Sequence, residues 1–399
     1  MYKLYCRTYQ FTFKIASQLS PLRAPALLEG NNSLKELPKV MKDKGIESIL
    51  IVTDKGIRAL GLMDDFIKGL ETEQISCVIY DKTVANPTIE NIEEALMVYH
   101  AHHCKGIIAF GGGSSIDCAK AVGARVARPD KSIPQLRGEL KIRKKIPFLA
   151  AVPTTSGTGS EATLAAVITN SETHEKYAIN DPVLVPDYAV LDPLLTVNLP
   201  PQYTASTGMD ALTHAVEAYI GRSNTKETEQ YSREAVKLIF ENLYEAYSNG
   251  SNLKARENMH RASHLAGMAF TRAYVGYVHA IAHTLGGFYS VPHGLANAII
   301  LPYVLRYYGE AIHQPLADLA DAAGISEPEE TMKQKAVKFI RAIEELNENM
   351  NIARKVSEIQ DRDIPLMVER AFKEANPLYP VPKILSKQDL KMLYHMIKE

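Results

Sequence analysis

A short apolar strand runs into a triple-glycine turn and then into a helix within the segment Ile107-Ile108-Ala109-Phe110-Gly111-Gly112-Gly113-Ser114-Ser115-Ile116-Asp117. We expect the helix to extend from about Ser114 to Arg128. Glycines let the backbone approach a ligand closely and adopt positive φ angles. The unpaired N–H groups at the helix start then face an anion, and the helix dipole adds to the attraction. The segment therefore predicts a pyrophosphate site, although an ordinary turn capped by Ser114 or Ser115 would use the same residues.

Strands and helices alternate around this segment, from about residue 48 to residue 192. A helix is predicted over 88–96, and strands are predicted over 48–54, 76–81, 107–110, 148–152, 163–168 and 188–191. Short apolar strands separated by helices are typical of βαβ units and a parallel sheet. A second polar, glycine-rich loop, Pro153-Thr154-Thr155-Ser156-Gly157-Thr158-Gly159-Ser160-Glu161, follows the strand that ends at Val152. It is either a solvated turn or, at the carboxyl end of a neighbouring strand, a second part of a ligand site.

The pattern changes at the double proline Leu199-Pro200-Pro201. From Tyr203 onward we find helical periodicity and no convincing strand, with helices predicted over 227–247, 253–272, 294–308, 330–346 and 364–375. The sequence therefore predicts an α/β domain with a parallel sheet over residues 1–199 and an all-α domain over residues 200–399.

The first 28 residues contain four basic side chains and no acidic one, which faintly resembles a transit peptide. The run Tyr9-Gln10-Phe11-Thr12-Phe13-Lys14-Ile15 alternates in the manner of an edge strand, and this is the interpretation we prefer.

The composition is that of an ordinary globular protein: 46% of the 399 residues are hydrophobic and the formal net charge is −1. It gives no electrostatic reason to expect nucleic acid or an anionic membrane as a partner. No apolar run approaches the roughly 18 residues of a membrane span. The four cysteines have no CxxC spacing and no disulfide pattern, which favours a reducing, cytoplasmic location.

Two histidine-bearing segments lie in the second half, Gly208-Met209-Asp210-Ala211-Leu212-Thr213-His214-Ala215-Val216-Glu217 and His279–Gly294. Residues four apart share one face of a helix, as Asp210 does with His214 and His279 does with His283. Imidazoles and a carboxylate are costly to bury together without a cation, and they suit iron, zinc or nickel. The alternative is that each histidine is an ordinary core or surface residue. Spacing alone does not choose four ligands from the five candidates Asp210, His214, His279, His283 and His293.

Asp54 closes the strand at 48–53, where a carboxylate can accept hydrogen bonds from ribose hydroxyls. Such an acid repels a 2′-phosphate and so favours NAD over NADP. In the familiar dinucleotide fingerprint the acid lies about 20 residues after the glycines, whereas Asp54 precedes Gly111. The site is therefore not a GxGxxG site, and the alternative is that Asp54 is an exposed turn residue.

These motifs together resemble the iron-dependent (group III) alcohol dehydrogenases. The resemblance spans roughly residues 30 to 390 and rests on Asn86-Pro87-Thr88, Gly111–Ser114, Pro153–Glu161, Gly208–Tyr219 and His279–Pro302. It implies a dinucleotide-binding α/β domain that faces an all-helical metal domain, with the active site in the cleft between them, and an assembly of two or more copies.

The resemblance also implies residue roles. His283 is the catalytic residue, as a substrate or proton-relay group, and the metal ligands are Asp210, His214, His279 and His293, the last two separated by a bend at Gly286-Gly287. The cofactor is NAD, and the metal is Fe²⁺ or alternatively Zn²⁺. The cofactor-binding residues are Asp54, Asn86, Gly111, Gly112, Gly113, Ser114, Asp117, Thr154, Thr155, Thr158 and Lys176.

The expected activity is hydride transfer between NAD(H) and a primary alcohol, a small diol or the corresponding aldehyde. The metal acts as a Lewis acid on the substrate oxygen. A polyol dehydrogenase or an NAD-using lyase such as dehydroquinate synthase shares the architecture and is the first alternative. A non-enzymatic binding protein is the second, and the complete set of expected ligands argues against it.

Overall fold

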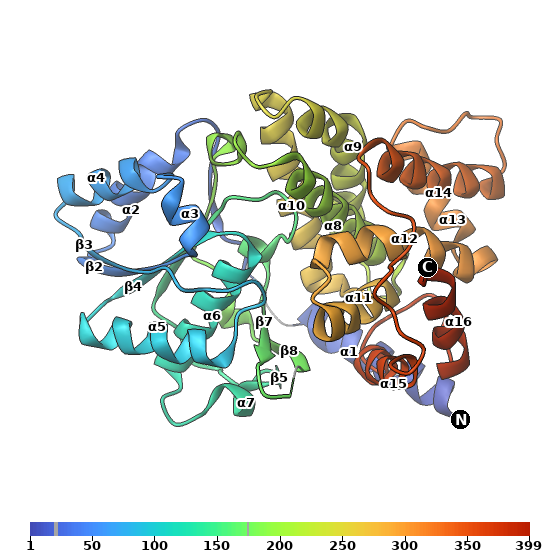
Figure 1. Ribbon diagram of the computed structural model, residues 1–399, viewed down its shortest axis with the longest axis horizontal. Helices are drawn as coiled ribbons and strands as arrows, with labels where there is room; N and C mark the ends of the chain where they lie inside the picture. Colours follow the sequence, from blue (N-terminus) through green and yellow to red (C-terminus); the bar gives the residue numbers. More distant parts are fainter. Residues whose placement is uncertain (20–22, 174) are drawn as a thin grey trace. The chain divides into compact units, whose positions relative to one another are not determined.

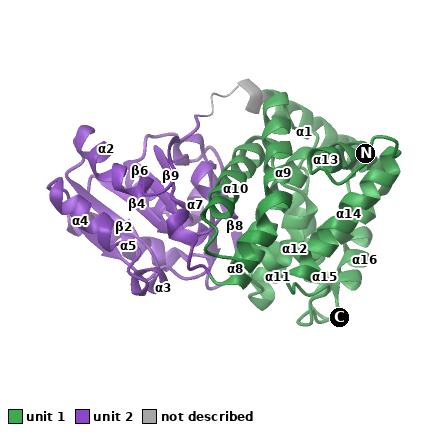
Figure 2. Ribbon diagram, turned by 90° about the horizontal axis from the view of Figure 1, so that it is seen from above, with its two compact units in different colours: residues 1–21, 200–399 green, residues 22–199 purple. Residues whose placement is uncertain are grey.

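The computed structural model describes residues 1–19, 23–173 and 175–399. It divides into two compact units, one formed by residues 22–199 and the other by residues 1–21 and 200–399 (Figure 2). We call them the α/β unit and the helical unit. The division falls between Leu199 and Pro200, at the double proline, but the first 21 residues join the helical unit and not the α/β unit.

The α/β unit contains a six-stranded, wholly parallel sheet in the order β1-β9-β6-β4-β2-β3. Its strands are β1 (Ala26–Glu29), β2 (Ser48–Val52), β3 (Ser76–Tyr80), β4 (Gly106–Gly111), β6 (Phe148–Pro153) and β9 (Tyr188–Leu191). The predicted parallel sheet is confirmed, although the sequence pattern missed the edge strand β1.

Helices cover both faces of this sheet (Figure 1). On β4, Ile107 and Ala109 join the hydrophobic cluster beneath α5 and α6, whereas Ile108 and Phe110 join the cluster beneath α2 and α4. Burial on both faces explains the continuous apolar runs from which the strands were predicted. The helices are α2 (Leu37–Asp43), α3 (Lys55–Ala59), α4 (Asp64–Thr72), α5 (Ile89–Ala101), α6 (Gly113–Ala127) and α7 (Ile133–Leu136), with 3₁₀ turns η1 (Ser33–Glu36), η2 (Ser160–Ala162), η3 (Pro182–Leu184) and η4 (Pro193–Thr196).

A separate three-stranded sheet, β5-β8-β7, completes the unit. It consists of β5 (Gly138–Glu139), β7 (Ala165–Asn170) and β8 (Glu175–Asn180). The strand predicted at 163–168 therefore begins two residues later, after η2, and pairs antiparallel with β8 outside the parallel sheet.

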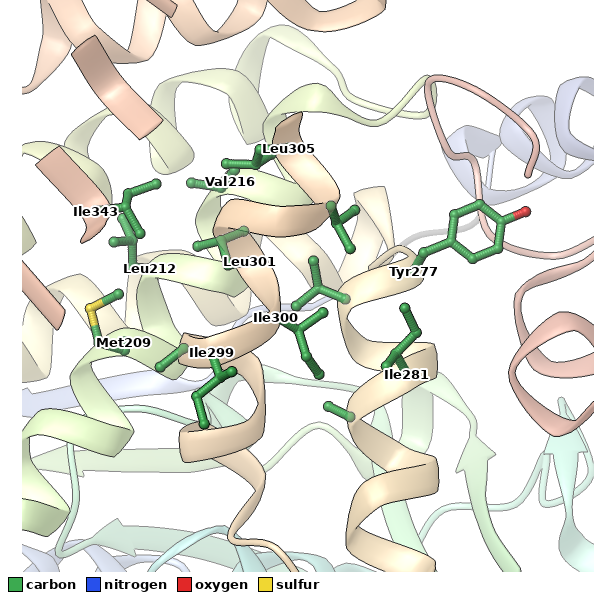
Figure 3. Close-up of a cluster of buried hydrophobic side chains, with 14 of the residues drawn as sticks. Met209, Leu212, Val216, Tyr277, Ile281, Ile299, Ile300, Leu301, Leu305 and Ile343 are labelled. Carbon is green, nitrogen blue, oxygen red and sulfur yellow. The ribbon is translucent and has the colours of Figure 1, made fainter. Parts of the chain in front are cut away.

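The rest of the helical unit is built from consecutive helices, as predicted. They are α8 (Pro201–Ile220), α9 (Lys226–Ser248), α10 (Leu253–Ala273), α11 (Tyr277–Tyr289), α12 (His293–Tyr308), α13 (His313–Ala322), α14 (Met332–Asn349), α15 (Ile364–Ala375) and α16 (Lys387–Ile397), with a 3₁₀ turn η5 (Gly309–Ile312) before α13. Figure 3 shows how Leu212 and Val216 of α8 face Leu301 and Leu305 of α12 in the shared core. No helix in the described part of the chain is both long enough and apolar enough to cross a membrane.

The prediction of an edge strand at residues 9–15 is wrong, because the segment belongs to helix α1 (Tyr2–Leu19). The buried face of α1 carries Cys6 and Gln10, which lie one helical turn apart and are almost fully buried. An alternating pattern of seven residues is too short to distinguish a strand from a helix that has few fully buried side chains.

Candidate active site

Helix α8 supplies Asp210 and His214, both buried and one turn apart on the same face. Glycines bring neighbouring helices close to this face. A Cβ at Gly208 would lie 2.2 Å from Leu243, and one at Gly294 would lie 2.3 Å from the carbonyl oxygen of Ser206. The start of α12 therefore approaches the backbone of α8 directly, which brings His293 to the acidic end of the cluster.

Helix α11 supplies His279, and α12 begins at His293. Together with Asp210 and His214 these residues form a group in which one ligand atom from each lies within 4.8 Å of all the others. The bend expected at Gly286-Gly287 is wrong. Helix α11 continues through both glycines to Tyr289, and the turn follows at Ser290, which has a φ of 58°.

The electrostatics of this group fit a cation. Burial raises the pKa of Asp210. Burial, and then the neighbouring histidines, lower the pKa of His279 well below its ordinary value. The ring centroids of His214 and His279 are 4.5 Å apart, which leaves no room for two imidazolium charges. Three neutral imidazoles and a carboxylate are a suitable donor set for Fe²⁺ or Zn²⁺, so the residues present fit the metal that the sequence predicts.

Glu217, which the sequence analysis did not single out as a functional residue, orients His279. Its carboxylate lies 2.6 Å from His279 Nδ1 and accepts hydrogen bonds from the backbone N–H groups of Gly276 at 2.8 Å and Val278 at 2.9 Å. Burial raises the pKa of Glu217 to about 7. A carboxylate on Nδ1 fixes the ring and leaves Nε2 for a metal. In the sequence, the available indication of this role was that Glu217 lies three residues after His214 on the same helix.

Asn297 is a second residue that the sequence analysis missed. Its amide nitrogen donates to Asp210 Oδ1 at 2.6 Å and lies 3.2 Å from Nε2 of both His279 and His293. It lies one turn after His293 on α12 and is fully buried. That spacing is the only signal that could have identified it.

His283 lies outside the four-residue group but next to it. Its ring stacks on His293 with centroids 5.1 Å apart. Its Nδ1 lies 2.6 Å from Glu374 Oε1, which also accepts a hydrogen bond from the Tyr379 hydroxyl at 2.8 Å. The side chain of His283 is 18% exposed, compared with 3% for His279. Its partial exposure and its contact with the Glu374 carboxylate distinguish His283 from the buried His279.

In the α/β unit, the two glycine-rich loops meet at the carboxyl ends of neighbouring strands, where Gly111 of β4 pairs with Pro153 of β6. Gly111 has a φ of 148°, and a Cβ at Gly113 would lie 2.7 Å from Thr158. Helix α6 is capped by Gly112 without a side-chain hydrogen bond, so the alternative of a Ser114 or Ser115 cap is wrong. A side chain at Gly113 would fill the space beside Thr158, and glycine leaves the N-terminus of α6 open to an anion.

Several predicted cofactor residues surround that helix start. The Asn86 backbone N–H donates to Ser114 Oγ at 3.1 Å, and Lys176 Nζ donates to Asn86 Oδ1 at 2.6 Å. Thr155 lies 3.6 Å from the position of a Cβ on Gly112. Within the described part of the chain, the buried Thr154 Oγ1 has no hydrogen-bond partner. A nucleotide phosphate would provide an acceptor for the Thr154 hydroxyl.

Asp117 and Asp54 have partners within the protein. Asp117 accepts hydrogen bonds from Ser160 Oγ at 2.7 Å and Val167 N at 3.2 Å, and burial raises its pKa to about 6. Asp54 caps helix α3, where its Oδ1 accepts from Ile57 N at 3.0 Å. Asp117 therefore holds the second glycine-rich loop in place through Ser160. Asp54 lies beside Gly111, with Oδ2 3.7 Å from the position of a Cβ there.

Both units of the chain match models of one known family. The model of the family "Iron-containing alcohol dehydrogenase" matches residues 24–193, and that of the "Fe-containing alcohol dehydrogenase family, C-terminal" matches residues 204–397. The chain is 40% identical over 351 residues to a 1,3-propanediol dehydrogenase of Citrobacter freundii, covering 87% of this chain and 90% of that protein. It is 33% identical over 371 residues to an NAD-dependent methanol dehydrogenase of Bacillus methanolicus, covering 92% and 97%. A crystal structure of a 1,3-propanediol oxidoreductase matches with a TM-score of 0.91 at 36% identity, covering 94% of this chain and 99% of that one.

Proposed function

The chain belongs to the iron-containing alcohol dehydrogenase family, and from this premise we propose that it oxidises short diols and primary alcohols at the group formed by Asp210, His214, His279 and His293. It is an NAD-dependent alcohol dehydrogenase with a metal site. The observation that carries the residue assignment is the meeting of four donor atoms within 4.8 Å, from three buried residues and the partly exposed His293.

Asp210, His214, His279 and His293 would hold a divalent cation, which would supply Lewis-acid chemistry for the substrate oxygen. NAD, when bound at the glycine-rich loops, supplies the hydride acceptor. The chain's own residues do the rest. Glu217 holds the His279 ring in one orientation, and Asn297 holds the Asp210 carboxylate through a 2.6 Å hydrogen bond. His283 takes the hydroxyl proton, and Glu374 steadies its Nδ1 so that Nε2 is the atom that exchanges it.

The decisive experiment follows NADH formation by the purified Fe²⁺-loaded protein with propane-1,3-diol, propan-1-ol and glycerol. We expect turnover with the diol and the primary alcohol, loss of turnover after chelation, and recovery on adding Fe²⁺. Zn²⁺ is tested in parallel as the alternative metal. NADH formation with glycerol alone would favour the polyol dehydrogenase, and NAD binding without net NADH formation would favour a lyase or a binding protein.

We expect His283→Ala to keep its metal and lose turnover. His283 is not one of the four residues whose donor atoms converge, so metal content measured by elemental analysis stays close to one per chain. The rate constant kcat falls by about 10²–10³-fold, the usual contribution of a general acid or base. The variant His283→Gln is the control for side-chain volume. Loss of metal from His283→Ala would instead place this residue among the ligands.

We expect Asp54→Gly to relax the choice of cofactor. A carboxylate at this position binds ribose hydroxyls and repels a 2′-phosphate, and a hundredfold preference for NAD requires only about 2.7 kcal/mol. Glycine also serves as an N-cap at a cost of a few tenths of a kcal/mol, so helix α3 is retained. The measurement is the ratio of kcat/KM for NAD and NADP, and Asp54→Asn is the control that removes the charge alone. A ratio unchanged in both variants would leave Asp54 as the cap of α3 only.

We further propose a cytoplasmic location, a homodimer or larger homo-oligomer, and no nucleic-acid or membrane partner. The four cysteines are free, which suits a reducing compartment. Strand β1 lies at the edge of the parallel sheet, and Leu27 on it is 41% exposed. An exposed strand edge presents unpaired N–H and C=O groups that can pair with another chain. Sedimentation of the purified protein tests the assembly.

A further inference from the structure

Helix α1 lies outside the ranges that the two family models match, yet it is an integral part of the helical unit. Cys6 is fully buried in the main core of that unit. The Tyr2 ring stacks on Phe372 of α15 with centroids 5.5 Å apart, and the Phe13 ring meets Tyr274 edge-on at 5.4 Å. Figure 1 shows α1 beside α15. The helix is therefore docked on the helical unit through residues 2–13.

Two side chains of α1 bind the loop that follows α15, residues 377–382. Gln10 Nε2 donates to the carbonyl oxygens of Tyr379 at 2.7 Å and Pro377 at 3.2 Å. The Arg7 guanidinium donates to the carbonyl oxygens of Val381 at 2.7 Å and Pro382 at 2.8 Å. Gln10 is only 5% exposed. A loop must satisfy its backbone acceptors with side chains, water or other backbone, and α1 satisfies four of them here.

The loop held in this way connects to the candidate catalytic histidine. Tyr379 is the residue whose carbonyl Gln10 holds, and its hydroxyl donates to Glu374 Oε1 at 2.8 Å. The same carboxylate oxygen lies 2.6 Å from His283 Nδ1. Three consecutive contacts therefore lead from the amide of Gln10, through Tyr379 and Glu374, to the ring of His283.

We infer that α1 is a positioning element of the catalytic centre. Gln10 and Arg7 fix the 377–382 loop, and the fixed loop keeps Tyr379, Glu374 and His283 in hydrogen-bonding positions. This inference rests on the proposed role of His283. The hydrogen bonds of Gln10 and Arg7 go to each other and to the 377–382 loop and not to the four candidate metal ligands, so their effect is on the geometry of proton transfer and not on metal affinity. Small displacements far from the reacting atoms are enough to lower turnover.

The test uses the full chain with Gln10→Met, which keeps the side-chain volume and removes the donor. Phe11→Ala is the matched control, since Phe11 is the next residue on the same helix and is 64% exposed. In the metal-free protein, amide hydrogen exchange of residues 377–385 is expected to become about tenfold faster in Gln10→Met and to stay unchanged in Phe11→Ala. In the Fe²⁺-loaded protein, kcat for propane-1,3-diol is expected to fall about tenfold, with metal content and the KM for NAD unchanged. Arg7→Lys is expected to retain more activity than Arg7→Ala, because its ammonium group can still donate to one of the two carbonyl oxygens.

A double-mutant cycle separates a positioning role from a merely structural one. If α1 acts through the Tyr379 hydroxyl and Glu374, adding Gln10→Met to Tyr379→Phe lowers kcat by less than about twofold further. Full additivity of the two losses, or faster exchange with unchanged kcat, would overturn the inference. Failure of the proposed role of His283 has a different signature, since His283→Ala would then turn over diol as fast as the unaltered chain. Failure of the proposed function itself would appear as no NADH formation from diol by the unaltered chain.

Discussion

The substitution His279→Ala is expected to abolish both bound metal and turnover while the fold survives. His279 lies at the centre of the ligand group, with its ring stacked on His214 and its Nδ1 on Glu217. Without it, three donors remain and the Glu217 carboxylate loses a partner. A bound cation contributes several kcal/mol to the reaction, so kcat falls by more than about 10³-fold.

Metal analysis, circular dichroism and NADH formation together check this expectation. His102→Ala is the control, because His102 is exposed on the α/β unit and far from the group in the chain. We expect normal metal and turnover from the control, and native helix content from both variants. Stoichiometric metal with normal turnover in His279→Ala would remove this residue from the ligand set.

The sequence predicted those features whose signal is local. The strand-to-helix turn at Gly111–Ser115 was predicted because a buried strand, a close backbone approach and a helix start each leave a mark within a few residues. The pairs Asp210/His214 and His279/His283 were visible because helical spacing places them on one face. Which four of the five meet was given only by the family resemblance, and the structure brings together the four that it named.

The residues that escaped prediction act through contacts between distant segments. Glu374 lies 91 positions from His283, and Asn297 lies 87 positions from Asp210. Their side chains are ordinary in their own helices and acquire a role only when those helices pack. Helix α1 was mispredicted for a related reason, since its buried face is defined by partners more than 360 positions away, at Tyr379 and Pro377.

Glu217 has a structural role and a role in the site that can be measured separately. It stabilises the loop before α11, and it orients the candidate metal ligand His279. Its two carboxylate oxygens take three donors: the N–H groups of Gly276 and Val278, and His279 Nδ1. A Cβ at Gly276 would lie 2.6 Å from Glu217 Oε1, so the loop before α11 is packed directly on the carboxylate. Removing the carboxylate therefore releases the loop and the ligand ring together.

We expect Glu217→Ala to lower the free energy of unfolding of the metal-free protein by about 3–5 kcal/mol, since each unsatisfied buried group costs about 1–3 kcal/mol. We expect Glu217→Gln to lower the free energy of unfolding by less, because one carbonyl oxygen remains as an acceptor. Some loss is still expected, because the new amide group would face an N–H donor. In both variants the affinity for Fe²⁺ is expected to fall by about 10–100-fold, the effect of losing a carboxylate that orients a ligand histidine.

Denaturant unfolding of the metal-free protein and titration with Fe²⁺ measure the two effects separately. Glu374→Gln is the matched control, since it removes a carboxylate from His283 and not from a ligand. It should leave Fe²⁺ affinity unchanged and lower only turnover. If Glu217→Gln lost stability but kept its full affinity for Fe²⁺, the carboxylate would serve only the loop at Gly276. Equal loss of metal affinity in Glu217→Gln and Glu374→Gln would mean that His283 shares the ligand role, because only then would both carboxylates act through metal-binding rings.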